Sequence, residues 1–186
     1  MILESLVTSV SASGELNVAP MGPIVDAGIT QIQLRPFKTS TTYGNLRATS
    51  RAVVHVTDDV LMIAQAAIGR IEPPPAVRPL DGGWFVLEKA SRWLAVEVVR
   101  WIDDPQRPTA DCAIRAEGTG PPFFGLNRAK HAVVEAAILA TRTHLLPAAE
   151  LLADLERLQV LVDKTAGDAE REAFALLQAT IRQRVG

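Results

Sequence analysis

The sequence WLAVEVVRWI at residues 93–102 alternates along its length and is rich in β-branched and aromatic side chains, which predicts a β-strand. A second segment, TADCAIRAE at residues 109–117, places Cys112 and Ile114 on one face and also predicts a strand. The intervening DDPQRP at residues 103–108 is turn chemistry, so we expect the two strands to form a hairpin. These residues make the chain a β protein in its first part.

The predicted hairpin is apolar on more than one side. Val99 and Trp101 join Val98 in a stretch that does not alternate cleanly with polar residues. A strand that is apolar on both faces is typically covered on both faces. A partner surface is one explanation for the outward face.

The first part of the chain predicts a second hairpin, turning at Ser13–Gly14. Pro20 and Pro23 cannot donate hydrogen bonds to a sheet ladder, so we expect residues 19–23 to form an edge or kinked strand with exposed backbone. Such a backbone could meet a ligand, and Gly22 would allow a close approach.

Other short elements are expected between the two hairpins. Asp58 is predicted to cap a helix, and the Pro- and Gly-rich residues 72–83 are predicted to be a loop. The expected strands are residues 30–37, 52–57 and 84–87, and the expected helices are residues 42–49 and 60–68.

Alanine, leucine and charged residues replace the β-formers after residue 120. We therefore predict two parts, residues 1–120 and a helical region at 121–186. The helices are expected at residues 128–145, from Pro147 onward, and at 169–184, with Gly167 as breaker and Asp168 as cap. A buried stripe is predicted on the second helix at Leu151, Leu155, Leu158 and Val162.

Composition excludes several classes of protein. The formal net charge is −2, from 19 basic and 21 acidic residues, so nucleic acid and anionic membrane surfaces are not expected partners. No run of about 18 apolar residues predicts a membrane span, and no signal peptide is recognised at the N-terminus. A lone Cys112 and three scattered histidines predict neither an intrachain disulfide nor a metal site. We expect a cytoplasmic protein.

The sequence RPFKTSTTY at residues 35–43 combines two cations with four consecutive hydroxyl residues before a predicted helix. Hydroxyls, a guanidinium and the free N–H groups of a helix start together suit a phosphate. Helix capping is the competing interpretation, but one cap needs one hydroxyl. We therefore favour an anion site.

Catalytic signatures are scarce. There is no P-loop and no Gly-x-Gly-x-x-Gly turn. Cys112 and His55 lie within predicted strands and are interpreted as buried structural residues, while Asp58 and Asp59 are explained by helix capping. Asn127, Arg128 and His131 gather at a helix start, where a solvated face with ion pairs is the favoured interpretation. No residue is assigned as a general acid or base.

Four long motifs resemble the uncharacterised DUF447 family. They are NVAPMGP at 17–23, LRPFKTSTTYGNL at 34–46, AVVHVTDD at 52–59 and NRAKHAVVEAAI at 127–138. The resemblance implies an α+β, mainly β fold, namely a split β-barrel of the FMN-binding type followed by a helical region. It also implies a homodimer with FMN near the interface.

The resemblance also implies roles for individual residues. Arg35, Thr39, Ser40, Thr41 and Thr42 would hold the FMN phosphate. Asn17, Pro20, Met21 and Gly22 would line the flavin ring, and Asn127 and Arg128 would approach the ligand or the partner chain.

The family has no firmly assigned reaction, so several functions stay open. The leading hypothesis is an FMN-dependent reductase or oxidase that acts on an unknown small molecule. A non-catalytic flavin-binding or flavin-sensing dimer is the second. A split barrel that uses deazaflavin or haem is the third; haem would need His55 or His131 as axial ligand, and the hydroxyl run argues against it.

Overall fold

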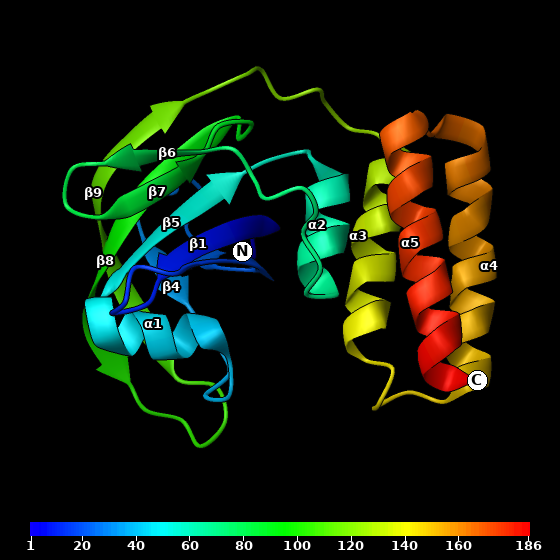
Figure 1. Cartoon of the computed structure of the whole chain (residues 1–186), viewed down its shortest axis with the longest axis horizontal. Coiled ribbons are helices and arrows are strands. Elements are labelled where there is room, and N and C mark those ends of the chain that lie inside the picture. The colour runs from blue at the N-terminus through cyan, green and yellow to red at the C-terminus, as the bar shows by residue number, and fades with distance from the viewer. The chain divides into compact units, whose positions relative to one another are not determined.

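The computed structural model describes residues 1–186, and its contacts divide the chain into two units (Figure 1). The first unit, which we call the barrel unit, contains Met1–Thr57 and Pro75–Phe123. The second, which we call the helical unit, contains Asp58–Pro74 and Phe124–Gly186. Composition separates residues 1–120 from 121–186, whereas the contacts also group residues 58–74 with the C-terminal helices.

The barrel unit is built on a curled antiparallel sheet of seven strands in the order β2-β1-β5-β8-β9-β4-β3. The strands β8 and β9 form the predicted hairpin, and β2, which contains Pro20, is an edge strand as expected. The bounds are β1 Ser5–Val10, β2 Leu16–Met21, β3 Ile24–Val25, β4 Ile32–Leu34, β5 Arg51–Val56, β8 Arg92–Ile102 and β9 Thr109–Thr119.

Both faces of this sheet are covered. Successive side chains of β5 point to opposite faces, and each face packs in its own apolar cluster. Ala52 and Val54 join one apolar cluster with Leu46 of helix α1, Thr41–Thr49. Val53, between them, points to the other face and packs with Trp93 and Val86 in a second cluster. The central strands are therefore buried on both sides, which explains their nearly continuous apolar sequences.

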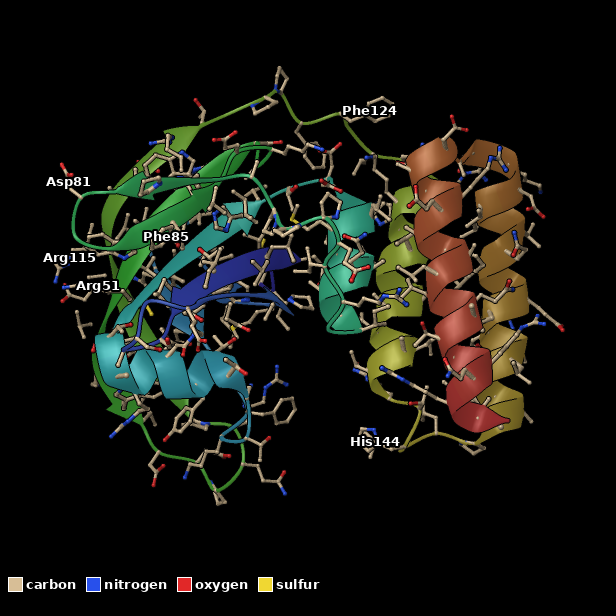
Figure 2. All side chains as sticks on the ribbon, in the orientation of Figure 1. Arg51, Asp81, Phe85, Arg115, Phe124 and His144 are labelled. Atoms are coloured by element: carbon tan, nitrogen blue, oxygen red, sulfur yellow. The ribbon has the colours of Figure 1, made fainter.

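The second face is covered by a two-stranded hairpin of β6 (Val77–Leu80) and β7 (Trp84–Leu87). The prediction that residues 72–83 form only a loop is therefore wrong for β6. β6 pairs with β7 on one side only. Pro79 is therefore tolerated, because a proline on an edge strand need not remove a hydrogen bond of the sheet. The turn contains Asp81, labelled in Figure 2, and two glycines with positive φ.

Four helices form the helical unit: α2 Val60–Ala67, α3 Arg128–Thr141, α4 Ala148–Thr165 and α5 Asp168–Val185. Small side chains make up most of the buried face of α3, which allows neighbouring helices to approach closely. The predicted stripe of α4 is confirmed at Leu151, Leu155 and Val162, which are buried, while Leu158 is half-buried. No helix of the structure combines the length and apolar character that crossing a bilayer requires.

Three predicted helix boundaries are wrong in detail. Asp59, not Asp58, caps α2, because its Oδ1 accepts the Met62 N–H at 3.1 Å. Gly167, not Asp168, is the cap residue of α5, and its N–H donates to Glu170 Oε2 at 2.9 Å. Helix α3 ends at Thr141, four residues before the predicted end.

Candidate functional site

The predicted phosphate-binding residues lie where the chain leaves β4 and enters α1. Ser40 is the N-cap residue of α1: its Oγ accepts the Tyr43 N–H at 3.2 Å and donates to the Phe37 carbonyl at 2.8 Å. One hydroxyl is thus used as a cap, as the competing interpretation required. Thr39 and Thr41 are exposed beside it, and the first N–H groups of a helix have no partner within the helix.

Thr42 connects this segment to the edge strand β2. Its hydroxyl is buried and accepts a hydrogen bond from Asn17 Nδ2 at 3.1 Å. Ser9 of β1 lies between, because its Oγ accepts from Asn45 Nδ2 at 3.1 Å and from Asn17 Nδ2 at 3.4 Å. The structure therefore brings together one residue predicted to line the flavin ring and one predicted to bind the phosphate.

Arg35 is the most informative of the predicted residues. Its Nε is buried and has no hydrogen-bond partner, although its carbonyl oxygen accepts from Arg107 Nε at 2.8 Å. A buried charged donor without an acceptor is costly. Such an atom, one residue beyond β4 and five before a helix N-cap, fits an anion that is bound between them.

The other predicted ring-lining residues are all half-buried and lie at the end of β2 or directly after it. Pro20 and Met21 pair with β1, and the Met21 carbonyl accepts the Ser5 hydroxyl at 2.7 Å. At Gly22 a Cβ atom would lie 2.6 Å from Ile2 Cγ2. In this structure the close approach that Gly22 allows is therefore made by the chain's own N-terminal segment.

Asn127 and Arg128 belong to the helical unit. Asn127 caps α3: its Oδ1 accepts the N–H groups of Ala129 and Lys130 at 2.8 and 3.1 Å, and its Nδ2 donates to the Thr165 carbonyl at 3.1 Å. Its amide is thus engaged within the unit, whereas Arg128 is exposed. Their approach to a ligand stays a prediction.

The two residues interpreted as structural are deeply buried. His55 Nε2 accepts the Leu87 N–H at 3.0 Å, so Nδ1 carries the proton and donates to the Leu6 carbonyl at 3.1 Å. Burial lowers the pKa of His55 to about 4 and raises the pKa of the Cys112 thiol to about 12. Neither group is poised for acid–base or nucleophilic chemistry at neutral pH, and a haem iron at His55 Nε2 would have to displace the Leu87 N–H from that nitrogen.

The far end of β8 carries apolar side chains on the surface. β5 pairs with β8 only as far as Glu97, and beyond it Val99 is 58% and Ile102 46% exposed. Trp101 is half-buried and meets Tyr43 of α1 edge to face, with ring centroids 5.5 Å apart. Of the apolar outward face anticipated from the sequence, only Val99 is therefore uncovered in a single chain, because Val98 and Trp101 pack against the first apolar cluster.

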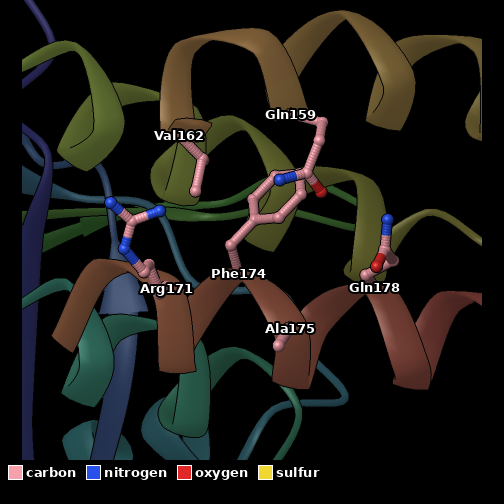
Figure 3. Close-up of a pocket in the computed structure, with 6 residues that line it drawn as sticks. All are labelled: Gln159, Val162, Arg171, Phe174, Ala175 and Gln178. Atoms are coloured by element: carbon pink, nitrogen blue, oxygen red, sulfur yellow. The ribbon is translucent and has the colours of Figure 1, made fainter. Parts of the chain in front are cut away.

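A shallow depression of about 200 Å³ lies between α4 and α5 (Figure 3). It contains none of the predicted site residues. Its lining residues are Gln159, Val162, Arg171, Phe174, Ala175 and Gln178. No group of three or more His, Cys, Asp or Glu side chains is arranged to hold a metal ion.

Comparison with known proteins identifies relatives. The sequence models described as the N-terminal domain of a protein of unknown function (DUF447), and as DUF447, match residues 3–119 and 127–179. An FMN-bound DUF447 protein from Methanosarcina mazei is 24% identical with a TM-score of 0.84, covering 96% of this chain and 94% of that chain. No curated protein matches the chain.

Two more distant structures have a similar fold over about two thirds of this chain. Nitrilotriacetate monooxygenase component B from Mycobacterium thermoresistibile is 16% identical, with a TM-score of 0.54 over 65% of this chain and 71% of that chain. The styrene monooxygenase flavin reductase from Pseudomonas putida is 15% identical, with a TM-score of 0.54 over 66% and 83%. These similarities confirm the predicted fold, a split β-barrel of the FMN-binding type followed by a helical region.

Proposed function

This chain belongs to the DUF447 family, and from that premise we propose that it binds FMN, with the phosphate at residues 35–42. The observation that carries the proposal is the buried, unpartnered Nε of Arg35 beside the N-terminus of α1. A phosphomonoester would supply the acceptor that this donor lacks, and the exposed hydroxyls of Thr39 and Thr41 would add donors.

The remaining predicted residues would position the isoalloxazine ring. Asn17, tied to Thr42, would hold the β2 edge at a fixed distance from the phosphate site, and Pro20, Met21 and Gly22 would meet the ring edge. When bound, the flavin supplies the hydride and electron chemistry. We propose an FMN-dependent oxidoreductase acting on a small molecule, in a cytoplasmic setting.

We also propose that the functional form is a homodimer. The exposed apolar end of β8 supports this, because an apolar strand face beside the ligand site is what a second chain would cover. Light scattering of the purified protein is expected to give twice the chain mass. Val99→Glu should shift the protein toward monomer; a monomeric wild type would refute the dimer.

Flavin retention tests the binding proposal. Apo-protein titrated with FMN should quench flavin fluorescence, and Arg35→Ala should weaken FMN roughly tenfold or more, as expected for the loss of a charge-assisted contact of about 1.5–3 kcal/mol. Arg115→Ala is a matched control, because Arg115 points outward from the barrel unit and pairs with Glu97 (Figure 2). Equal affinities for all three proteins would contradict the phosphate assignment.

A second candidate is a flavin binder without catalytic turnover. It is favoured by the burial of His55 and Cys112, which leaves neither of them ready to move protons. Anaerobic mixing of the FMN-loaded protein with NADH or NADPH separates the two functions. Bleaching of the flavin absorption supports the oxidoreductase, and a flavin that neither donor reduces supports the binder.

A further inference from the structure

The loop between β8 and β9, residues 103–108, contacts the predicted phosphate-binding segment from a distant part of the sequence. The Lys38 N–H donates to the Gln106 carbonyl at 3.0 Å, and Lys38 Nζ pairs with Asp103 at 3.0 Å. Arg107 Nε donates to the carbonyl of Arg35, 72 residues away, at 2.8 Å. The loop thus contacts the phosphate-binding segment at Arg35 and at Lys38, the two cations of that segment.

The loop is itself organised by one carboxylate. Asp104 Oδ1 accepts the N–H of Gln106 at 2.9 Å and of Arg107 at 2.6 Å. These bonds, with a smaller contribution from the charges of Arg35 and Lys38, lower the pKa of Asp104. The Arg107 guanidinium is additionally placed over the Phe37 ring, 4.7 Å from its centroid.

We propose that Arg107 is a positioning residue for the phosphate of the bound flavin, acting through Arg35. The inference rests on the proposed function. Arg107 binds the backbone of Arg35, and the Arg35 side chain carries the buried Nε that has no partner. A guanidinium recognises phosphate only within a narrow geometry, so anchoring the backbone from which it projects sets its affinity.

Arg107→Ala tests the proposal when FMN and riboflavin are titrated in parallel. Riboflavin lacks the phosphate but shares the ring, so it reports general damage to the site. We expect the FMN Kd to rise roughly five- to tenfold, the effect of one lost hydrogen bond, while the riboflavin Kd changes less than about twofold. Arg115→Ala likewise removes an arginine, but one whose Nε pairs with Glu97, and it should change neither Kd.

A second pair of variants tests the same positioning role of the loop without replacing an arginine. Asp104→Asn and Asp104→Ala both remove the negative charge, but the asparagine Oδ1 can still accept the two N–H bonds that shape the loop. Asp104→Ala should therefore bind FMN several-fold more weakly than Asp104→Asn, with equal riboflavin affinities. If Arg107→Ala does not fold, this comparison of the two Asp104 variants tests the positioning role in its place.

The outcomes separate this inference from the proposed function. Wild-type protein that binds neither flavin overturns both. Wild-type protein that prefers FMN to riboflavin, with Arg107→Ala and Asp104→Ala keeping the same preference, overturns the role of Arg107 alone. Equal losses of FMN and riboflavin in Arg107→Ala overturn it as well, because a structural role would then explain the effect.

Discussion

Acid sensitivity of the barrel unit should depend on His55. The side chain is fully buried and joins three strands, because it donates to the Leu6 carbonyl of β1 and accepts the Leu87 N–H of β7 while it belongs to β5. Protonation of Nε2 would break the bond to Leu87 and place a charge in an apolar site. The folded barrel therefore requires neutral His55.

The size of the effect follows from the pKa of His55, which burial lowers from 6.5 to about 4. Between these values the unfolded chain binds a proton that the folded chain does not, so the stability falls as the pH decreases from 6.5 to 4. A difference of about 2.5 pKa units corresponds to about 3 kcal/mol of unfolding free energy. Above pH 6.5 this contribution is fully present.

Urea unfolding at pH 7.5 and 4.5, followed by tryptophan fluorescence, measures this contribution of His55 to the unfolding free energy. All three tryptophans, Trp84, Trp93 and Trp101, lie in the barrel unit, so the signal reports that unit. His55→Gln keeps a donor and an acceptor but does not titrate, and the wild type should lose about 2.5 kcal/mol more than the variant between the two pH values. Equal losses in both proteins would refute the argument from burial.

Further predictions concern packing and charge. Gly118→Ala places a Cβ 2.5 Å from the buried Trp93 ring and should lower the unfolding free energy of the barrel unit, measured by urea titration, by about 1–3 kcal/mol. Gly44→Ala adds a Cβ in open space within α1 and should raise that free energy by about 0.5–1 kcal/mol. A loss at Gly44 or none at Gly118 contradicts this reasoning. Lys130→Met removes the ammonium that contacts the half-buried Asp58 at 3.1 Å and the buried Glu170 at 3.3 Å. This change should lower the unfolding free energy by about 2 kcal/mol in a urea titration that follows the helices by circular dichroism. The exposed Lys164→Met is its control, and equal midpoints for the two variants would show that the network contributes nothing.

Strongly patterned segments were predictable from the sequence. Alternating β-formers predicted β8 and β9, two prolines predicted that β2 is an edge, and a leucine stripe predicted the buried face of α4. The strand β6 was missed because its pairing with β7, rather than local propensity, makes it a strand. The grouping of residues 58–74 with the C-terminal helices was missed for a similar reason, since those helices lie more than 50 residues further along the chain.

The amino-acid sequence was enough to identify the family, the split-barrel fold that the family implies, and the segment that resembles a phosphate site. These depend on residue types in a local order, which a sequence carries directly. Tertiary structure alone decided that Asn17 bonds Thr42, that Arg35 Nε is buried without a partner, and that Arg107 holds the Arg35 backbone. Hydrogen bonds across 25 and 72 residues depend on how strands pair and the sheet curls, and no local pattern encodes that placement.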